Sequence, residues 1–169
     1  MMNRVLVIGS GGAGKTTFAN RLAKLTGQPV IHMDHLCYDK AGKRRPEQAY
    51  AALLNDALAQ PEWIMEGNYL NTFPKRLARA DTVVFLRYSR ATCVLGVLGH
   101  WIKGVFCPRD AAGYRDKDLF RLRFLHWVWQ FNRSEADEME ELLHGHHDKE
   151  LFLFRHRRDA HYFFKKIGE

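Results

Sequence analysis

The chain has 169 residues, 46% of them hydrophobic and 27% charged, and a formal net charge of +7. This length and composition are typical of one globular domain, residues 1–169, and exclude a collagen-like, low-complexity or repeat protein. Apolar runs stay short of the roughly 18 residues that a membrane helix needs, so no membrane partner is expected. Three scattered cysteines without a C-x-x-C pair argue against a disulfide framework and a zinc site.

A glycine-rich segment follows the first apolar run. Residues 9–16 read Gly-Ser-Gly-Gly-Ala-Gly-Lys-Thr and lead into a helical pattern. This spacing lets backbone N–H groups surround the β- and γ-phosphates of a nucleotide, while Lys15 contacts the phosphates and Thr16 holds Mg²⁺. We therefore expect ATP and Mg²⁺ as cofactors, bound by Gly9, Ser10, Gly11, Gly12, Ala13, Gly14, Lys15, Thr16 and Thr17.

The same glycines permit a second interpretation. Gly9, Gly11 and Gly14 also spell the G-x-G-x-x-G dinucleotide fingerprint, and Asp34 follows about twenty positions later. A dinucleotide turn has no use for Lys15 and Thr16 directly after its last glycine, so the triphosphate interpretation is favoured. Because the apolar start runs straight into this loop, cleavage as a signal peptide would destroy the site, and we expect a cytoplasmic protein.

Strand and helix patterns alternate along the rest of the chain. The expected strands are residues 3–8, 30–33, 63–65, 82–86 and 151–154; the expected helices are 15–26, 46–59, 75–79, 91–102, 119–143 and a closing helix near 160–167. This alternation predicts an α/β fold, a P-loop NTPase with a five-stranded parallel sheet and helices on both faces. Residues 103–118 are expected to form a lid segment that closes over the phosphates. A surface insertion is the alternative for this segment.

Polar side chains follow the second and third expected strands, at the sheet edge where ligands bind in parallel folds. Asp34 is a candidate to accept a proton from a substrate hydroxyl or to orient metal-bound water. Glu66 is a candidate for the magnesium site, and Asn68 and Tyr69 for substrate contacts. Helix capping for Asp34, and plain turn chemistry for the segment after Glu66, are the alternatives.

Lys and Arg residues gather in three segments, residues 40–45, 75–90 and 101–133. Such clusters favour bound phosphate groups, nucleic acid or a solvated basic surface. We expect Arg76 and Arg115 to contact the substrate, Arg123 to neutralise charge during catalysis and Arg155 to border the nucleotide. The basic segments favour a phosphorylated or acidic small-molecule acceptor.

Several segments together resemble the topology modulation protein family, which is similar to adenylate kinase among the P-loop kinases. They are the glycine-rich segment, His32-Met33-Asp34, residues 63–69 (Trp-Ile-Met-Glu-Gly-Asn-Tyr), residues 76–86 and residues 124–129. The resemblance covers nearly the whole chain. It implies a five-stranded parallel sheet with a lid, Asp34 near the phosphoryl acceptor and Glu66 where relatives carry an Asp for magnesium-bound water.

Two departures from the family pattern limit what is carried over. Arg87 stands where the family has Asp, and residues 99–103 replace an arginine-rich run that enters the lid. Lid arginines are therefore not transferred from the family.

The sequence predicts a small ATP-dependent kinase, a monomer or homodimer, that transfers a phosphoryl group from MgATP to an unidentified acceptor. The alternative is a nucleic-acid-associated ATPase involved in DNA topology modulation, although no DNA-binding motif is present. A dinucleotide-binding protein is the third interpretation.

Overall fold

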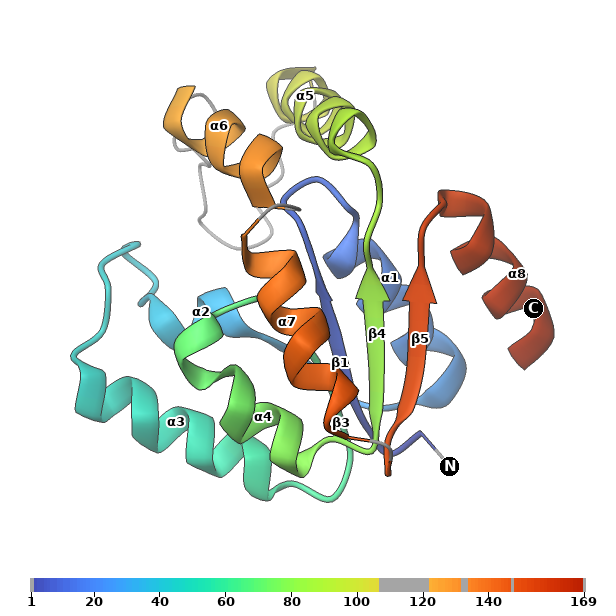
Figure 1. Ribbon diagram of the computed structural model, residues 1–169. Helices are drawn as coiled ribbons and strands as arrows, with labels where there is room; N and C mark the ends of the chain where they lie inside the picture. Colours follow the sequence, from blue (N-terminus) through green and yellow to red (C-terminus); the bar gives the residue numbers. More distant parts are fainter. Residues whose placement is uncertain (1, 107–121, 132–133, 147, 169) are drawn as a thin grey trace.

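The computed structural model describes residues 2–106, 122–131, 134–146 and 148–168 (Figure 1). Its strands form one parallel sheet in the order β2-β3-β1-β4-β5. The strands are β1 (Arg4–Gly9), β2 (Val30–His32), β3 (Trp63–Glu66), β4 (Thr82–Leu86) and β5 (Glu150–Phe154). The predicted α/β class and five-stranded parallel sheet are confirmed.

The strand order bears on the dinucleotide interpretation. In the doubly wound dinucleotide-binding fold, the second strand lies beside the first. Here β3 pairs with β1 and separates it from β2. The chain therefore does not have the strand order that the dinucleotide fingerprint requires.

Helices cover both faces of the sheet. They are α1 (Lys15–Thr26), α2 (Met33–Cys37), α3 (Glu47–Ala59), α4 (Phe73–Arg79), α5 (Arg90–Phe106), α6 (Leu122–Gln130), α7 (Glu135–His144) and α8 (Arg157–Ile167), with a 3₁₀ turn, η1 (Leu70–Thr72). Alternate residues of β1 point to opposite sides, so Leu6 and Ile8 pack with α2, α3, α4 and α7, whereas Val5 and Val7 pack with α1 and α8. This burial on both faces explains why β1 is a continuous apolar run.

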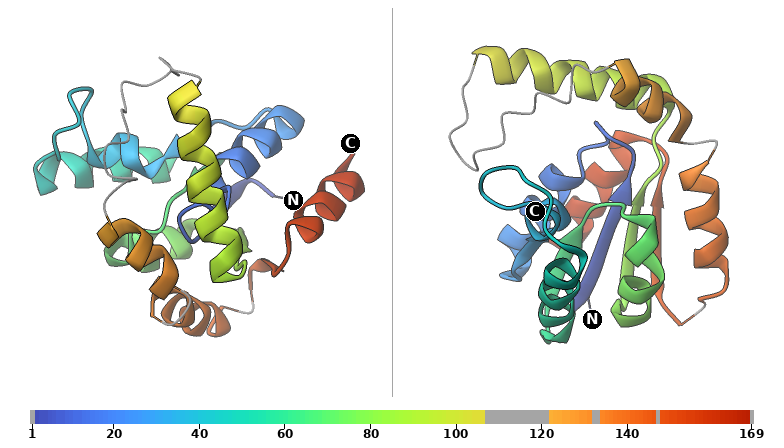
Figure 2. Two further views of the ribbon diagram at one scale, coloured as in Figure 1. Left: turned by 90° about the horizontal axis from the view of Figure 1, so that it is seen from above. Right: turned by 90° about the vertical axis from the view of Figure 1, so that its left-hand side faces the viewer.

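Helices α5 and α6 lie across the carboxyl edge of the sheet, above the ends of the strands (Figures 1 and 2). There α5 meets the turn after β1 backbone to backbone. A Cβ built on Gly96 would lie 2.1 Å from the carbonyl oxygen of Gly12, and one built on Gly12 would lie 2.1 Å from the carbonyl oxygen of Cys93. Only glycine at both positions permits this approach.

The structure corrects three expected boundaries. Residues 119–143 do not form one helix: within them α6 ends at Gln130 and α7 starts at Glu135, because α6 packs against the turn after β1 while α7 packs against the side of the sheet. Helix α5 continues through Phe106, so the expected loop does not begin at residue 103, and the rest of the expected lid lies outside the described residues. Asp34 lies in the short helix α2, which was expected to be a strand end and loop.

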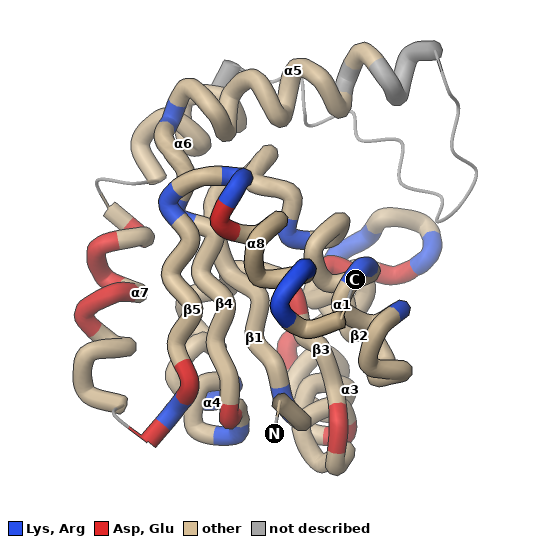
Figure 3. The backbone as a smooth tube through the Cα atoms, turned by 90° about the vertical axis from the view of Figure 1, so that its right-hand side faces the viewer, with Lys and Arg blue, Asp and Glu red and all other residues tan. Residues whose placement is uncertain are grey.

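Arg87, at the position where the resembled family carries Asp, joins the end of β4 to α7. Its guanidinium forms ion pairs with Asp137 and Glu140. Figure 3 shows the acidic residues along α7 and basic residues near the ends of β4 and β5. Arg87 therefore uses its charge within the fold.

In the described parts of the chain, no helix has both the length and the hydrophobicity needed to cross a membrane.

Two glycines of α5 provide a matched test of the contact with the turn. Gly96→Ala should lower the free energy of unfolding by about 3 kcal/mol, because the new methyl group would overlap backbone atoms of Gly12. Chemical denaturation measures this loss.

Gly99→Ala, one turn further along α5, is the control. No atom lies within 4 Å of a Cβ built at Gly99. The free energy of unfolding of this variant should therefore stay unchanged or rise by up to about 1 kcal/mol, because alanine has the higher helix propensity. Equal stability of the two variants would contradict the close contact.

Candidate functional site

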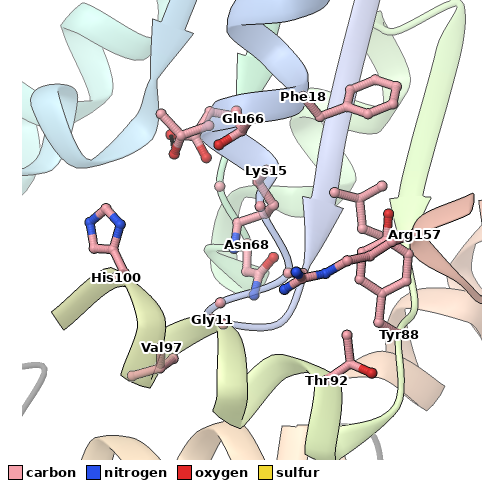
Figure 4. A pocket seen from close by; sticks show the side chains of 18 of the residues that line it. Gly11, Lys15, Phe18, Glu66, Asn68, Tyr88, Thr92, Val97, His100 and Arg157 are labelled. Carbon is pink, nitrogen blue, oxygen red and sulfur yellow. Dashed lines mark hydrogen bonds between the residues drawn. The ribbon is translucent and has the colours of Figure 1, made fainter. Parts of the chain in front are cut away.

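A cavity of about 1120 Å³ opens at the carboxyl edge of the sheet. The turn after β1 forms its floor, and α5 and α6 form one wall. The start of α1, Asp34 in α2, the segments after β3 and β4 and the helix α8 also line it. Figure 4 shows Lys15, Glu66 and Asn68 on one side of this cavity and Tyr88, Thr92 and Arg157 on another. The predicted site residues that line it are Gly11, Gly12, Ala13, Gly14, Lys15, Thr16, Thr17, Asp34, Glu66, Asn68 and Tyr69.

Residues 9–16, which run from the end of β1 into the start of α1, are called the glycine loop below. Gly12 has φ 75° and Gly14 has φ 89°, both in the left-handed region that side chains other than glycine rarely adopt. Gly14 is the N-cap of α1, so the loop leads directly into the helix N-terminus. Backbone N–H groups and a positive dipole end at such a position favour an anion.

Lys15 bends back over the glycine loop. Its Nζ donates hydrogen bonds to the carbonyl oxygens of Gly9 at 2.8 Å and Ser10 at 3.1 Å. Burial lowers the pKa of Lys15 below its ordinary value, while the negative charges of Glu66 and Asp34 act in the opposite direction. Lys15 Nζ therefore contacts the loop, and the two predicted carboxylates, Asp34 and Glu66, line the same cavity.

Glu66, the last residue of β3, is buried and faces the start of α1. Its Oε1 accepts hydrogen bonds from Thr16 Oγ1 at 3.3 Å and from the His32 ring at 2.9 Å. Burial raises the pKa of Glu66, but the hydrogen bond from His32 and the charge of Lys15 outweigh it, so the pKa lies below the ordinary value. The same hydrogen bond raises the pKa of His32 against the effect of burial. Glu66 is thus held ionised beside the hydroxyl of Thr16.

The donor set at this point fits Mg²⁺. The Thr16 hydroxyl and the Glu66 carboxylate are hard oxygen ligands within hydrogen-bond distance of each other. Among the described residues, no group of three or more His, Cys, Asp or Glu could form a metal site. Mg²⁺ commonly binds through one or two protein oxygens together with substrate phosphates, and these residues suit that kind of site.

Asp34 and Tyr69 contact each other in the lining of the cavity. Tyr69 has φ 41°, and its hydroxyl donates a hydrogen bond of 2.5 Å to Asp34 Oδ1. Burial and this contact with Asp34 raise the pKa of Tyr69, so its hydroxyl stays protonated and remains the donor. Asp34 is exposed, and one of its oxygens is fixed by Tyr69.

Asn68 and Arg76 organise the backbone of the site. Asn68 Oδ1 accepts a hydrogen bond of 3.1 Å from the N–H of Gly9, which links the turn after β3 to the glycine loop. Arg76 is fully buried, and its guanidinium donates to the carbonyl oxygens of Gly67 at 2.8 Å, Tyr69 at 3.0 Å and also Asn68. The structure does not bring Arg76 into the lining of the cavity.

The structure does not bring Arg155 into the lining of the cavity. Arg155 is exposed, and its backbone N–H donates to Asp159, whereas Arg157 lines the cavity. Arg115 lies outside the described residues, and Arg123 lies in α6 with a side chain outside the described part.

Sequence reasoning missed the contribution of Arg157 and that of the α5 and α6 side chains Thr92, His100, Phe124 and Trp127. His156 and Asp159 form a capping box, which makes Arg157 the first residue of α8. The spacing of His156 and Asp159 could have indicated that a helix begins at Arg157. Gly96 could have indicated that α5 approaches another backbone segment closely.

Arg76→Met should lower the free energy of unfolding by about 3 kcal/mol, because buried carbonyl oxygens lose their donors. Arg79→Met is the matched control on the same helix, since Arg79 is exposed and donates to the Leu58 carbonyl at 3.3 to 3.4 Å. We expect a loss of about 1 kcal/mol or less for the control. Similar denaturation midpoints for the two variants would contradict this role of Arg76.

Comparisons with known proteins concern the fold. No protein-family model matches the chain, and a search of curated protein sequences finds no relative. The resemblance to the topology modulation family therefore stays a prediction. Solved structures do match, among them a shikimate kinase from Acinetobacter baumannii in complex with shikimate, with a TM-score of 0.62 and 19% identity over 99% of this chain and 91% of that one.

Two further matches extend over nearly the whole of both chains. A shikimate kinase from Bacteroides thetaiotaomicron has a TM-score of 0.63 and 14% identity over 99% of this chain and 97% of that one. A deoxyadenosine kinase from M. mycoides with bound dATP has a TM-score of 0.55 and 13% identity over 99% and 100%. At these identities the likeness concerns the fold alone: the chain shares its five-stranded parallel α/β fold with these solved structures.

Proposed function

We propose that the protein is an ATP-dependent kinase that transfers a phosphoryl group to a hydroxyl group of a small molecule. The observation that carries this proposal is the meeting of Lys15, Thr16 and Glu66 with Asp34 around one cavity. The first three residues suit a metal-bound triphosphate, and the fourth suits an acceptor. The kinase-like P-loop fold supports the same reaction class.

The glycine loop and Lys15 would hold the phosphates. In-line phosphoryl transfer asks the protein chiefly for positioning and for neutralisation of charge. On this proposal Lys15 Nζ exchanges the carbonyl oxygens of Gly9 and Ser10 for phosphate oxygens. Arg157, which extends toward the glycine loop in Figure 4, is a further cation that lines the cavity.

Thr16 and Glu66 would hold the magnesium ion, Thr16 through its hydroxyl and Glu66 through its carboxylate. When bound, the ion neutralises charge on the phosphate oxygens. The low pKa of Glu66 keeps its carboxylate ionised for this role.

Asp34 would serve the acceptor hydroxyl. One of its oxygens accepts the Tyr69 hydroxyl, which fixes the orientation of the carboxylate, and its exposed position in the cavity suits contact with a substrate. A carboxylate fixed in this way can accept the proton that the attacking hydroxyl loses. Asn68 and Arg76 would act indirectly, by holding the backbone of the glycine loop and of the turn after β3 in place.

The nucleic-acid-associated ATPase draws less support from the described residues. Two of the arginines in the expected basic segments are engaged within the fold, Arg76 by backbone carbonyls and Arg87 by α7. These two arginines are therefore engaged away from any DNA surface, whereas Lys15 and Arg157 line the cavity proposed for the phosphates.

Lys15→Met should reduce acceptor-dependent ADP release by about 10²- to 10³-fold, because a main electrostatic contact to the transferred group is lost. The assay is a panel of nucleosides, nucleotides, sugars and hydroxy acids with MgATP. Lys24→Met, an exposed lysine at the end of the same helix, should behave as wild type.

Full turnover by Lys15→Met would refute the phosphate role of Lys15. If no acceptor raises ADP release above background hydrolysis, while DNA stimulates it, the alternative ATPase function would replace the proposed one. Such stimulation would fall steeply with salt.

Tyr69→Phe should lower kcat with the active acceptor by about tenfold and leave KM for ATP unchanged, because only the orientation of Asp34 is affected. Tyr162→Phe, an exposed tyrosine on α8, is the control. An unchanged kcat in Tyr69→Phe would show that this hydrogen bond does not serve the reaction.

A further inference from the structure

The register of strands β2 and β3 brings His32 into contact with Glu66. It is the last residue of β2 and pairs with Glu66, the last residue of β3. Residues paired across neighbouring strands project to the same face of a sheet, so the ring and the carboxylate meet because of the register. The His32 Nδ1 lies 2.9 Å from Glu66 Oε1.

The chemistry of the pair fixes the direction of this hydrogen bond. An ionised carboxylate only accepts hydrogen bonds, so Nδ1 of His32 carries the proton and donates it. Thr16 Oγ1 reaches the same Oε1, at 3.3 Å. Both donors therefore hold one oxygen of Glu66, and in the described structure Oε2 is the carboxylate oxygen without a protein donor.

Glu66 needs such a contact to keep one orientation. Its side chain is 9% exposed, and that of His32 is 22% exposed, so the hydrogen bond is largely shielded from water. The Thr16 hydroxyl is the other direct donor, and on the proposed function it would turn toward the metal. His32 would then be the protein donor that still fixes Glu66.

We propose that His32 is a positioning residue for magnesium: it orients the Glu66 carboxylate so that the nucleotide binds together with its metal ion. This inference rests on the proposed function, because it assumes that Thr16 and Glu66 form the magnesium site. A merely structural role, in which His32 joins β2 to β3, would affect stability and would leave the metal dependence of nucleotide binding unchanged.

The test measures binding of a slowly hydrolysed ATP analogue by calorimetry, with Mg²⁺ and with EDTA. The ratio of the two affinities is the magnesium enhancement. His32→Leu should reduce this enhancement by about tenfold, as expected for the loss of a hydrogen bond to a metal-binding carboxylate, and should leave the EDTA affinity unchanged. His32→Asn has the same branching and number of non-hydrogen side-chain atoms as His32→Leu and keeps a donor near the Nδ1 position, so it should restore most of the enhancement.

Two controls complete the experiment. His161→Ala, an exposed histidine on α8, should behave as wild type. In a Glu66→Gln background, His32→Leu should produce no further loss of enhancement, since its effect acts through the carboxylate.

Equal enhancement in His32→Leu and His32→Asn, or an undiminished effect of His32→Leu in the Glu66→Gln background, would overturn the proposal. If His32→Leu fails to fold, His32→Ala takes its place in the same comparison. A wild-type protein that binds the analogue with no magnesium enhancement would instead refute the proposed magnesium site. The two failures are therefore distinguishable.

Discussion

The hydrogen bond from the Gly9 N–H to Asn68 Oδ1 is the link on which the geometry of the site depends. It joins the end of β1 to the turn after β3. The guanidinium of Arg76 fixes that turn by donating hydrogen bonds to the carbonyl oxygens of the turn. Because these groups are buried, breaking the link would leave polar atoms without partners. The glycine loop and Glu66 are therefore held in one relative position.

Packing on the outer side of the glycine loop adds a second constraint. Helix α5 approaches Gly12 through Gly96, and α6 places Phe124 and Val128 against Gly11. The loop is thus bounded by backbone and aromatic groups on one side and by β3 on the other. Its conformation depends on elements that are distant in sequence, which explains why the glycines of the loop and Gly96 on α5 serve the same site.

Charge in the described structure is used in two different ways. Arg76 and Arg87 bind backbone carbonyls and the acidic helix α7, so they stabilise the fold. Lys15 and Arg157 face the cavity, together with the carboxylates of Asp34 and Glu66. Net charge alone does not separate these groups, because a basic residue has the same formal charge whether it is engaged inside the fold or directed at a ligand.

The sequence by itself determined the strand pattern, the glycine loop and the position of Glu66 at the end of β3, because these features follow from local periodicity and from the steric freedom of glycine. Tertiary structure decided which side chains share the cavity: it brought in Arg157 rather than Arg155, buried Arg76 and paired His32 with Glu66. It also divided the segment expected to be one helix into α6 and α7. Strand register and helix packing join residues far apart in the chain, and local patterns carry no information about those distances.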